Sequence, residues 1–189
     1  AHMLRAQSGF YGGVKSLQDQ VAVYDCLAAQ FPQFGKETEG LHVLAVQGGN
    51  FPGVLTRARP VRTLADLKGL RLRAQSDAID VLRELGADPV NMPMGEVYSA
   101  LAKGVIDGVV APADTIKSLH FAEVAKHFTA LHFSRGAYPA RAMSDAAWRR
   151  LPPDLQALMQ SSKPVWEEAL ARQILKAEAD GVTYASGHG

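Results

Sequence analysis

The sequence has one cysteine, almost no net charge and no long apolar stretch. Because Cys26 is the only thiol, no disulfide can form within the chain and no zinc site made of several thiolates can assemble. Lys and Arg total 20 against 19 for Asp and Glu, so the formal net charge is +1. No basic run is long enough to follow a phosphate backbone. We therefore expect no nucleic-acid partner, and we expect Cys26 to be a small buried hydrophobic residue on a helix.

Signals for membranes, metals and the common enzyme classes are also missing. No apolar stretch of about 18 residues is present to form a membrane span. The sequence has no HExxH pair, no GxSxG elbow, no GxxxxGKS/T loop and no GxGxxG motif after a strand. Its six histidines are scattered without the spacing of metal ligands. We expect neither a metal nor a cofactor.

What is present is an ordinary globular composition with clear periodicity. Hydrophobic residues make up 47% and charged residues 21% of the 189 residues, which is enough chain for one large domain or slightly more. Apolar residues recur at helical spacing over residues 17–31, and Pro32 ends that helix. Residues 41–46 are expected to form a buried strand, and the glycine- and proline-rich residues 48–53 a loop.

Strands and helices alternate through the middle of the chain. A strand over 70–73 is followed by a helix over 79–85, an extended segment over 89–94, a helix over 97–105 and a strand over 105–111. Such alternation implies right-handed crossovers between parallel strands. The expected fold class is therefore α/β, with a mostly parallel sheet that helices cover on both faces.

The last part of the chain is predicted to be helical. Ser144 can cap a short helix that contains Trp148. A long helix then runs from Pro153 towards Gly181, and Pro164 should kink or break it. A helix of this length often spans more than one layer or domain, so we expect it to meet a further packing surface.

Arg73 is the most informative single residue. It stands at the end of a predicted parallel strand, where open α/β sheets place their ligand crevices. Its guanidinium group can hold a carboxylate through two parallel hydrogen bonds. A surface ion pair is the alternative role, and position alone does not choose between the two.

Several motifs, in a shared order, resemble one protein family. Residues 66–73, DLKGLRLR, resemble the DLKGLKIR segment of the substrate-binding proteins of TRAP transporters, the DctP-like family. Residues 86–108 then follow the order of the family's GANPVPMPFSEVYTALQTGVVDG, and residues 148–156, WRRLPPDLQ, resemble its WxxLPPDVQ. The resemblance covers the chain from about residue 41 to about residue 160.

This resemblance implies a fold and an organisation. Family members have the two-lobed fold of type II periplasmic binding proteins, and we expect this chain to be a fragment that holds mostly the second lobe. The expected divisions are a cloning remnant at 1–3, a helical remainder of the first lobe at 4–40, an α/β ligand-binding lobe at 41–143 and an incomplete helical segment at 144–189. Because a missing lobe leaves apolar surface uncovered, we also expect self-association.

The resemblance further implies a function and a set of binding residues. The expected protein is a non-enzymatic periplasmic receptor, its signal peptide removed, that captures a small organic acid and delivers it to the membrane subunits of a TRAP transporter. Arg73 matches an arginine that binds the ligand carboxylate. Around it we expect polar contacts from Gln75 and Asp114, an apolar side made by Met94 and Ala111, and an approach by Gly49 and Asn50 from the loop after the first strand.

The sequence departs from the family in ways that bear on the ligand. Val109, Val110 and Ala111 stand where many members have Gln-Glu-Asn, and Met94 stands where an aromatic residue is common. We expect a less polar pocket wall and a ligand with an apolar body. On the helix that follows, Tyr98 is expected to be a core aromatic residue.

Two other functions stay open at this stage. One is an effector-sensing module of a transcription regulator on the same two-lobed scaffold, which would need a DNA-binding domain elsewhere in the gene. The other is an enzyme on that scaffold, for which Asp107 and Asp114 are the only nearby carboxylates to serve as acid and base. Turnover of a bound acid would favour the enzyme, whereas saturable binding without turnover would favour the receptor.

Overall fold

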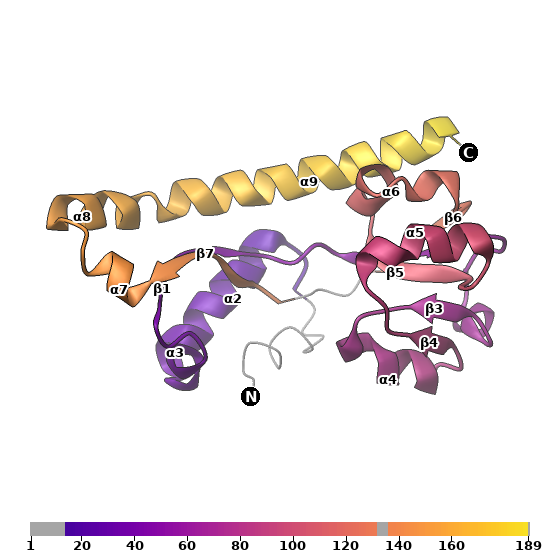
Figure 1. Cartoon of the computed structure of the whole chain (residues 1–189), viewed down its shortest axis with the longest axis horizontal. Coiled ribbons are helices and arrows are strands. Elements are labelled where there is room, and N and C mark those ends of the chain that lie inside the picture. The colour runs from indigo at the N-terminus through magenta and orange to yellow at the C-terminus, as the bar shows by residue number, and fades with distance from the viewer. Residues whose placement is uncertain (1–13, 132–135, 189) are drawn as a thin grey trace. The chain divides into compact units, whose positions relative to one another are not determined.

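The structure, a computed structural model, describes residues 14–131 and 136–188 and contains two compact units (Figure 1). Each unit is discontinuous because the chain passes from one to the other more than once. The cloning remnant expected at residues 1–3 lies outside the described residues. The first unit takes its residues from 1–50 and 133–175, and the second from 51–132 and 176–189.

The first unit begins with helices packed on a two-stranded sheet. Helix α2 (Leu17–Gln30) starts where the Ser16 side chain accepts a hydrogen bond from the Asp19 N–H at 3.0 Å. A short helix, α3 (Gln33–Glu37), follows, and the edge of the Tyr24 ring packs on Phe34 with 5.6 Å between ring centroids. The helix expected over 17–31 is therefore confirmed.

Strand β1 (Leu41–Gln47) pairs antiparallel with β7 (Tyr138–Ser144) in this unit. The strand expected over 41–46 is confirmed, but its partner lies almost a hundred residues away in the sequence. Consequently the two ends of the segment 41–143, expected as one lobe, pair with each other in the first unit, while most of that segment forms the second.

Three helices complete the C-terminal part of the chain. The Ser144 side chain caps α7 (Asp145–Trp148) by accepting a hydrogen bond from the Ala147 N–H at 3.2 Å. The Trp148 ring stacks on the His42 ring with 3.7 Å between their centroids. Helices α8 (Pro153–Ser161) and α9 (Lys163–His188) are separated at Ser162, which confirms the break expected near Pro164.

The second unit contains a five-stranded sheet in the order β4-β3-β5-β2-β6. Strand β3 pairs parallel with β4 and β5, whereas β2 pairs antiparallel with β5 and β6. The α/β class is confirmed, but the expectation of a mostly parallel sheet is wrong because half of these pairings are antiparallel. The strands are β2 (Pro52–Thr56), β3 (Arg71–Arg73), β4 (Asp88–Val90), β5 (Gly108–Pro112) and β6 (His127–Ala130).

Strand β2 was not expected from the sequence patterns. Its first residues, Pro52 and Gly53, were expected in a loop because both types usually interrupt strands. Proline is tolerated here as the first residue of the strand. Glycine is required because a Cβ atom at Gly53 would lie 2.1 Å from Cε2 of the Phe128 ring. The aromatic ring on β6 thus takes the space that a side chain on β2 would occupy.

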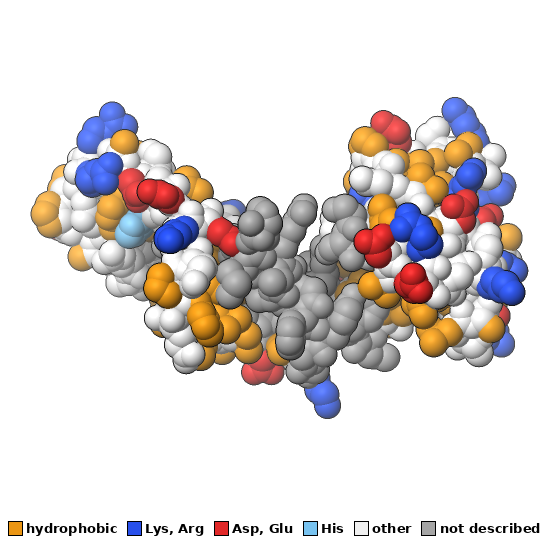
Figure 2. All heavy atoms as spheres, turned by 90° about the horizontal axis from the view of Figure 1, so that it is seen from below, with side chains coloured by type: hydrophobic (Ala, Val, Ile, Leu, Met, Phe, Trp, Pro, Cys, Tyr) orange, Lys and Arg blue, Asp and Glu red, His pale blue; other side chains and the backbone are white. Residues whose placement is uncertain are grey.

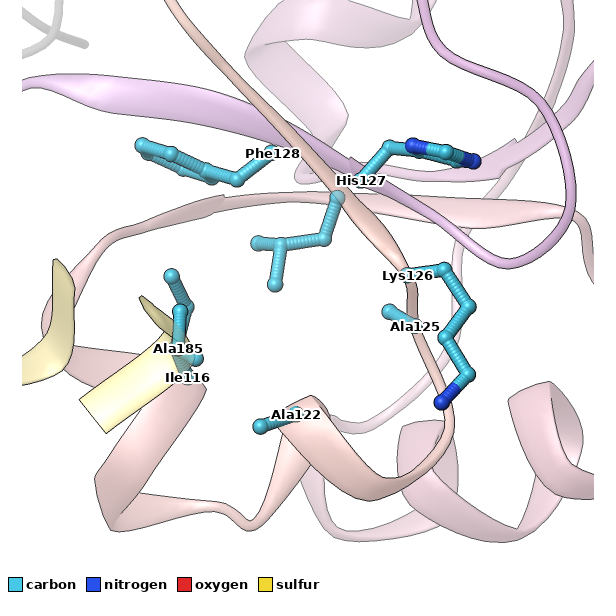
Figure 3. A pocket seen from close by; sticks show the side chains of 8 residues that line it. Ile116, Ala122, Ala125, Lys126, His127, Phe128 and Ala185 are labelled. Atoms are coloured by element: carbon cyan, nitrogen blue, oxygen red, sulfur yellow. The ribbon is translucent and has the colours of Figure 1, made fainter. Parts of the chain in front are cut away.

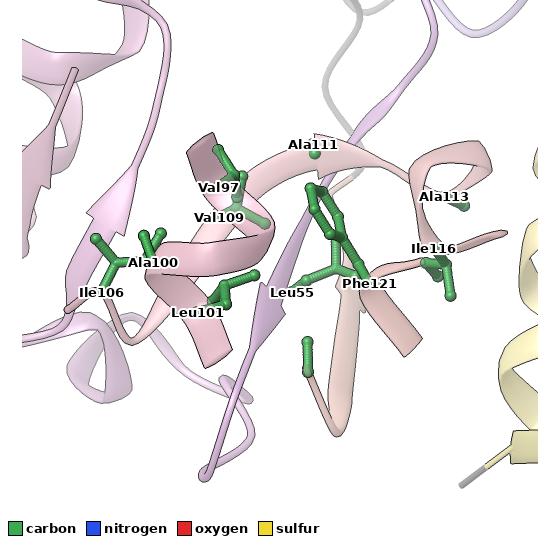
Figure 4. Packing of buried hydrophobic residues seen from close by; sticks show 11 residues of the cluster. Leu55, Val97, Ala100, Leu101, Ile106, Val109, Ala111, Ala113, Ile116 and Phe121 are labelled. Atoms are coloured by element: carbon green, nitrogen blue, oxygen red, sulfur yellow. The ribbon is translucent and has the colours of Figure 1, made fainter. Parts of the chain in front are cut away.

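Helices cover both faces of this sheet, as expected. One face carries Leu55, Val109 and Ala111, which pack with residues of α5, α6 and η2 (Figure 4). The other face carries Val54 and Leu72 and packs on η1 and α4. These helices are η1 (Leu64–Leu67), α4 (Ser76–Glu84), α5 (Met94–Lys103), α6 (Asp114–Ser118) and η2 (Phe121–Glu123).

Two side chains expected in the core are exposed. Cys26 lies on the outer side of α2, whose buried positions are Leu17, Gln20 and Tyr24, so its thiol accepts only from the Gln30 side chain at 3.3 Å. Tyr98 is 37% exposed, and its hydroxyl donates to Glu123 Oε2 at 2.6 Å. In both cases the apolar residue type was read correctly but assigned to the wrong face of its helix.

The next features are the charges on one face of the molecule and the apolar character of the described helices. On the face shown in Figure 2, basic and acidic side chains are intermixed over both units. Within the described ranges, no helix combines the length and the apolar character that a membrane crossing requires.

Helix α9 contributes to both units. In the first unit, Glu167 Oε1 accepts from the Val46 N–H at 2.9 Å. In the second, Gly181 lies directly on the start of α6, where an added Cβ atom would be 2.1 Å from the Ala113 carbonyl oxygen. A backbone contact at this distance leaves no room for a side chain, so Gly181 lets α9 lie directly against the start of α6.

We therefore predict that Gly181→Ala destabilises the protein, even though alanine favours a helix by about 1 kcal/mol over glycine. Overpacking against a backbone carbonyl should outweigh that gain and lower the free energy of unfolding by about 1 to 3 kcal/mol. The matched control is Gly187→Ala on the same helix, where nothing lies within 4 Å of an added Cβ. Urea unfolding of both variants measures the difference, and equal stabilities would contradict the close contact.

Candidate functional site

The candidate site is the edge of the sheet at which β3, β4 and β5 end. Arg73 is the last residue of β3, and both neighbours of β3 run parallel to it. The carboxyl ends of three strands therefore meet at one edge, which is the position where open α/β sheets bind ligands. This confirms the strand-end position expected for Arg73.

The Arg73 side chain is buried and only partly satisfied. The residue is 6% exposed, and its Nε donates to the Met92 carbonyl oxygen at 3.0 Å. Its Nη1 is buried without a hydrogen-bond partner, and burial lowers the pKa of the guanidinium group. Arg71, two residues earlier, differs in being exposed and paired with Asp88 at 3.0 Å.

A surface ion pair is therefore not the role of Arg73. Among the ion pairs between described residues, none includes it. A buried cation with unused donors is costly unless an anion completes its hydrogen bonds. The arrangement suits a carboxylate that enters at the strand ends, because the guanidinium fork matches its two oxygens.

The structure gathers four of the other predicted residues at the same edge. Ala111 is 3% exposed on β5 and lies on the face of Arg73, because Arg73 pairs with Val109 and side chains alternate along a strand. Met94 opens α5 after β4 and packs against the same apolar cluster as Ala111. Gln75 precedes α4 directly after β3, and Asp114 opens α6 after β5.

The remaining two predicted residues, Gly49 and Asn50, belong to the first unit. They follow β1, and the Gly49 N–H donates to Gln20 Oε1 at 2.7 Å, so this amide is already engaged. Gln20 is 2% exposed on α2 and its Nε2 has no partner. Sequence reasoning missed Gln20, although a polar residue on the buried stripe between Leu17 and Tyr24 was a usable signal.

The expected apolar wall at residues 109–111 needs correction. Val109 and Ala111 face one apolar cluster, whereas Val110 packs on the cluster beneath the opposite face. Three consecutive strand residues cannot line one pocket because their side chains alternate. Of the two residues on the face of Arg73, Ala111 lies nearer the carboxyl end of β5.

The proposed acid and base of an enzyme do not meet beside Arg73. Asp107 Oδ2 accepts from the Arg71 N–H at 2.8 Å, which places it before β5, towards the opposite edge of the sheet. It serves there as a structural acceptor. Within the described ranges, no three His, Cys, Asp or Glu side chains are grouped to hold a metal.

A second partly satisfied polar group lies on α9 in the second unit. Glu178 has one buried carboxylate oxygen, Oε1, without a partner. Burial is the main cause that raises its pKa, the charge of Asp114 raises it further, and a hydrogen bond from the Phe51 N–H opposes both. Glu178 therefore links α9 to the start of β2, at the cost of placing two carboxylates close together.

Comparison with known proteins gives one consistent result. The family model of bacterial extracellular solute-binding proteins, family 7 (DctP), matches residues 21–186. The 2,3-diketo-L-gulonate-binding periplasmic protein YiaO of Escherichia coli is 32% identical over 128 residues, which are 67% of this chain and 39% of that protein. The sialic acid-binding periplasmic protein SiaP of Vibrio cholerae is 28% identical over 136 residues, 71% of this chain and 42% of that protein.

Solved structures agree. A TRAP solute-binding protein of Rhodoferax ferrireducens, in complex with copurified benzoate, is 26% identical to this chain with a TM-score of 0.81. The match covers 100% of this chain and 60% of that protein's chain. A second TRAP solute-binding protein, from Roseobacter denitrificans with bound 3-deoxy-D-manno-oct-2-ulosonic acid, is 28% identical with a TM-score of 0.75. That match covers 92% of this chain and 59% of the other. The expected binding-protein fold is confirmed, and the chain spans less than half the length of the two curated relatives.

The geometry at Glu178 predicts a pH-dependent stability. Folding raises the pKa of Glu178 above its ordinary value of 4.5. The protonated Glu178 side chain therefore contributes fully to the free energy of unfolding below pH 4.5, and this contribution is lost as pH rises through the folded-state pKa. Glu178→Gln should remove this dependence. It should also raise the melting temperature at neutral pH by roughly 2 to 4 °C, the shift for about 1 kcal/mol in a chain of this size.

Thermal unfolding between pH 4 and pH 8 measures this effect, with Glu168→Gln as the control, since Glu168 is an exposed carboxylate on the same helix. If Glu178→Gln and the wild type show parallel pH profiles, the buried carboxylate does not titrate as described.

Proposed function

The chain belongs to the bacterial extracellular solute-binding proteins of family 7, and on this premise we propose that it forms the carboxylate-binding part of a TRAP solute-binding protein. The observation that carries the proposal is the Arg73 guanidinium, which is buried at the strand ends with its Nη1 unpartnered. The ligand is a small organic acid. Its carboxylate completes the hydrogen bonds of Arg73, and no covalent step takes place.

The other residues at this edge complete the proposed site. Met94 and Ala111 provide apolar contacts, while Gln75 and Asp114 contact polar groups of the ligand. Gly49 and Asn50, which belong to the first unit, stay a prediction from the sequence. The ligands named for the relatives support this class, because benzoate, 3-deoxy-D-manno-oct-2-ulosonic acid, sialic acid and 2,3-diketo-L-gulonate all carry a carboxylate.

Location and partners follow from the same family. Relatives are named as periplasmic proteins, which supports a periplasmic receptor. The proposed partners are the membrane subunits of a TRAP transporter, to which the receptor delivers its acid.

The first test concerns Arg73 as the anchor of the carboxylate. Truncating one member of a desolvated charge pair costs about 2 to 5 kcal/mol of binding, so Arg73→Ala should weaken benzoate binding by a factor of roughly 30 or more. Arg73→Lys should also weaken it, because an ammonium group cannot reproduce the planar two-pronged geometry. Isothermal titration of the 189-residue chain with benzoate measures both effects.

Arg71→Ala is the matched control, since Arg71 lies on the same strand but is exposed and already paired with Asp88. We expect its affinity for benzoate to stay within about twofold of the wild type. Equal affinity in wild type and Arg73→Ala would remove the proposed role of Arg73.

The second test concerns the polarity of the ligand. Met94 and Ala111 cannot pair with hydroxyl groups, and a buried unpaired hydroxyl costs about 1 to 3 kcal/mol, so polyhydroxylated acids should bind more weakly. At a concentration 100 times its dissociation constant, a ligand stabilises the protein by about 2.7 kcal/mol, or roughly 5 to 10 °C. A thermal-shift comparison of benzoate with D-glucuronate is sensitive enough, and a larger shift with D-glucuronate would contradict the apolar wall.

A further inference from the structure

A small pocket opens on the second unit away from the strand ends of β3 (Figure 3). Its floor is formed by Leu55 of β2 and Ile116 of α6, each 2% exposed. The Phe128 side chain on β6 lines it further, and Lys126, just before β6, lies beside it with an exposed side chain. Alanines from three separate segments leave the hollow open: Ala122 of η2, Ala125 before β6 and Ala185 of α9.

This pocket is separate from the proposed carboxylate site. Arg73 is on β3, whereas the pocket is bounded by β2 and β6, and β5 lies between β3 and β2 in the sheet order. No residue of the carboxylate site lines the pocket. A role for the pocket therefore goes beyond the proposed function and does not depend on it.

The size of the pocket points to an aliphatic side chain. Its volume is about 50 Å³. One water-sized atom needs roughly 10 to 15 Å³ of such space, so the pocket holds about three to five heavy atoms, which is the side chain of Val, Leu or Ile. A cavity that binds benzene has a volume of about 150 Å³, so this pocket is too small to enclose an aromatic ring.

A free small molecule of this size is a poor occupant. Burial of one aliphatic side chain strengthens an interaction by roughly 10- to 150-fold, which does not offset the loss of translational and rotational freedom on association. When a partner protein carries the aliphatic side chain, the rest of the partner surface already makes contacts that offset this loss of freedom. Burial of the side chain then adds its full gain in affinity to those contacts. A side chain of a partner protein is therefore favoured over a metabolite.

The charge beside the pocket indicates what flanks that side chain. Lys126 has no ion pair among the described residues. Glu123, three residues earlier, cannot serve it, because Oε2 accepts from the Tyr98 hydroxyl at 2.6 Å and Oε1 lies 3.2 Å from His120 Nδ1. The Lys126 ammonium is thus available to a carboxylate from outside.

We propose that this pocket is a docking point for a partner protein that inserts one aliphatic side chain and places an acidic residue against Lys126. The alanines define the space for the side chain, and the lysine selects the charge next to it. Ala185 belongs to the C-terminal part of α9, so an occupant of the pocket also contacts this helix.

The test titrates the 189-residue chain, with its methyl groups isotopically labelled for NMR, with two synthetic peptides. One is acetyl-Thr-Glu-Leu-Glu-Thr-amide, and the other replaces both Glu residues with Lys. We expect the acidic peptide to shift the methyl signals of Ile116 and Leu55 with millimolar affinity. The basic peptide should bind more weakly by about two- to fivefold or more.

Variants assign the two components of the pocket. Ala122→Leu fills the pocket and should weaken binding of the acidic peptide by roughly tenfold. Ala185→Leu is a second variant that fills the pocket, for use if the first fails to fold. Lys126→Met should abolish the preference for the acidic peptide, whereas Lys117→Met, at an exposed lysine on α6, should leave it unchanged. Arg73→Ala and added benzoate should have no effect, which separates this site from the proposed function.

The proposal is overturned if neither peptide shifts the Ile116 methyl signals, if the basic peptide binds as tightly as the acidic one, or if folded filling variants bind like the wild type. Shifts that grow with protein concentration in the absence of peptide would assign the pocket to a second copy of this chain instead and overturn it as well.

Discussion

The parallel pairing of β3 with β4 and β5 is the constraint on which the candidate site depends. Parallel strands end at the same edge of a sheet, so the segments that follow them are brought together although they are distant in sequence. Arg73, Met94 and Asp114 meet this edge only because all three strands run the same way. The antiparallel strands β2 and β6 extend the sheet beyond β5, and residues of both strands line the separate pocket beside Lys126.

Three buried polar atoms lack partners among the described residues, and each marks a point where packing alone does not explain the sequence. They are Arg73 Nη1, Gln20 Nε2 and Glu178 Oε1. Each such atom costs stability, and the cost is greatest for a charge. Each of the three side chains also makes a hydrogen bond with a backbone group, of Met92, Gly49 and Phe51 respectively. For Arg73 the unpartnered atom, Nη1, is the observation on which the proposed carboxylate site rests.

Close backbone contacts explain where pattern reasoning failed. Gly53 lies inside β2 because the Phe128 ring lies over it, and Gly181 lies inside α9 because the Ala113 carbonyl touches the helix there. In each case a residue type that usually interrupts an element is required by a neighbour far away in sequence. The same limit applies to helix faces, since whether Cys26 and Tyr98 face inward depends on what packs against α2 and α5. Periodicity shows that a helix has an apolar face, but not which borderline residues belong to it.

Local physics was sufficient for much of this protein. The helix over 17–30, the strand over 41–47, the break before Pro164 and the position of Arg73 at a strand end all follow from spacing, caps and breakers, because these act over a few residues. The order of motifs from Asp66 to Gln156 was likewise enough to indicate the family. Tertiary structure alone decided the pairing of β1 with β7, the antiparallel half of the second sheet and the burial of Arg73 with Nη1 unpartnered among the described residues. Those properties depend on which distant segments meet, and a local pattern of residues contains no information about its distant neighbours.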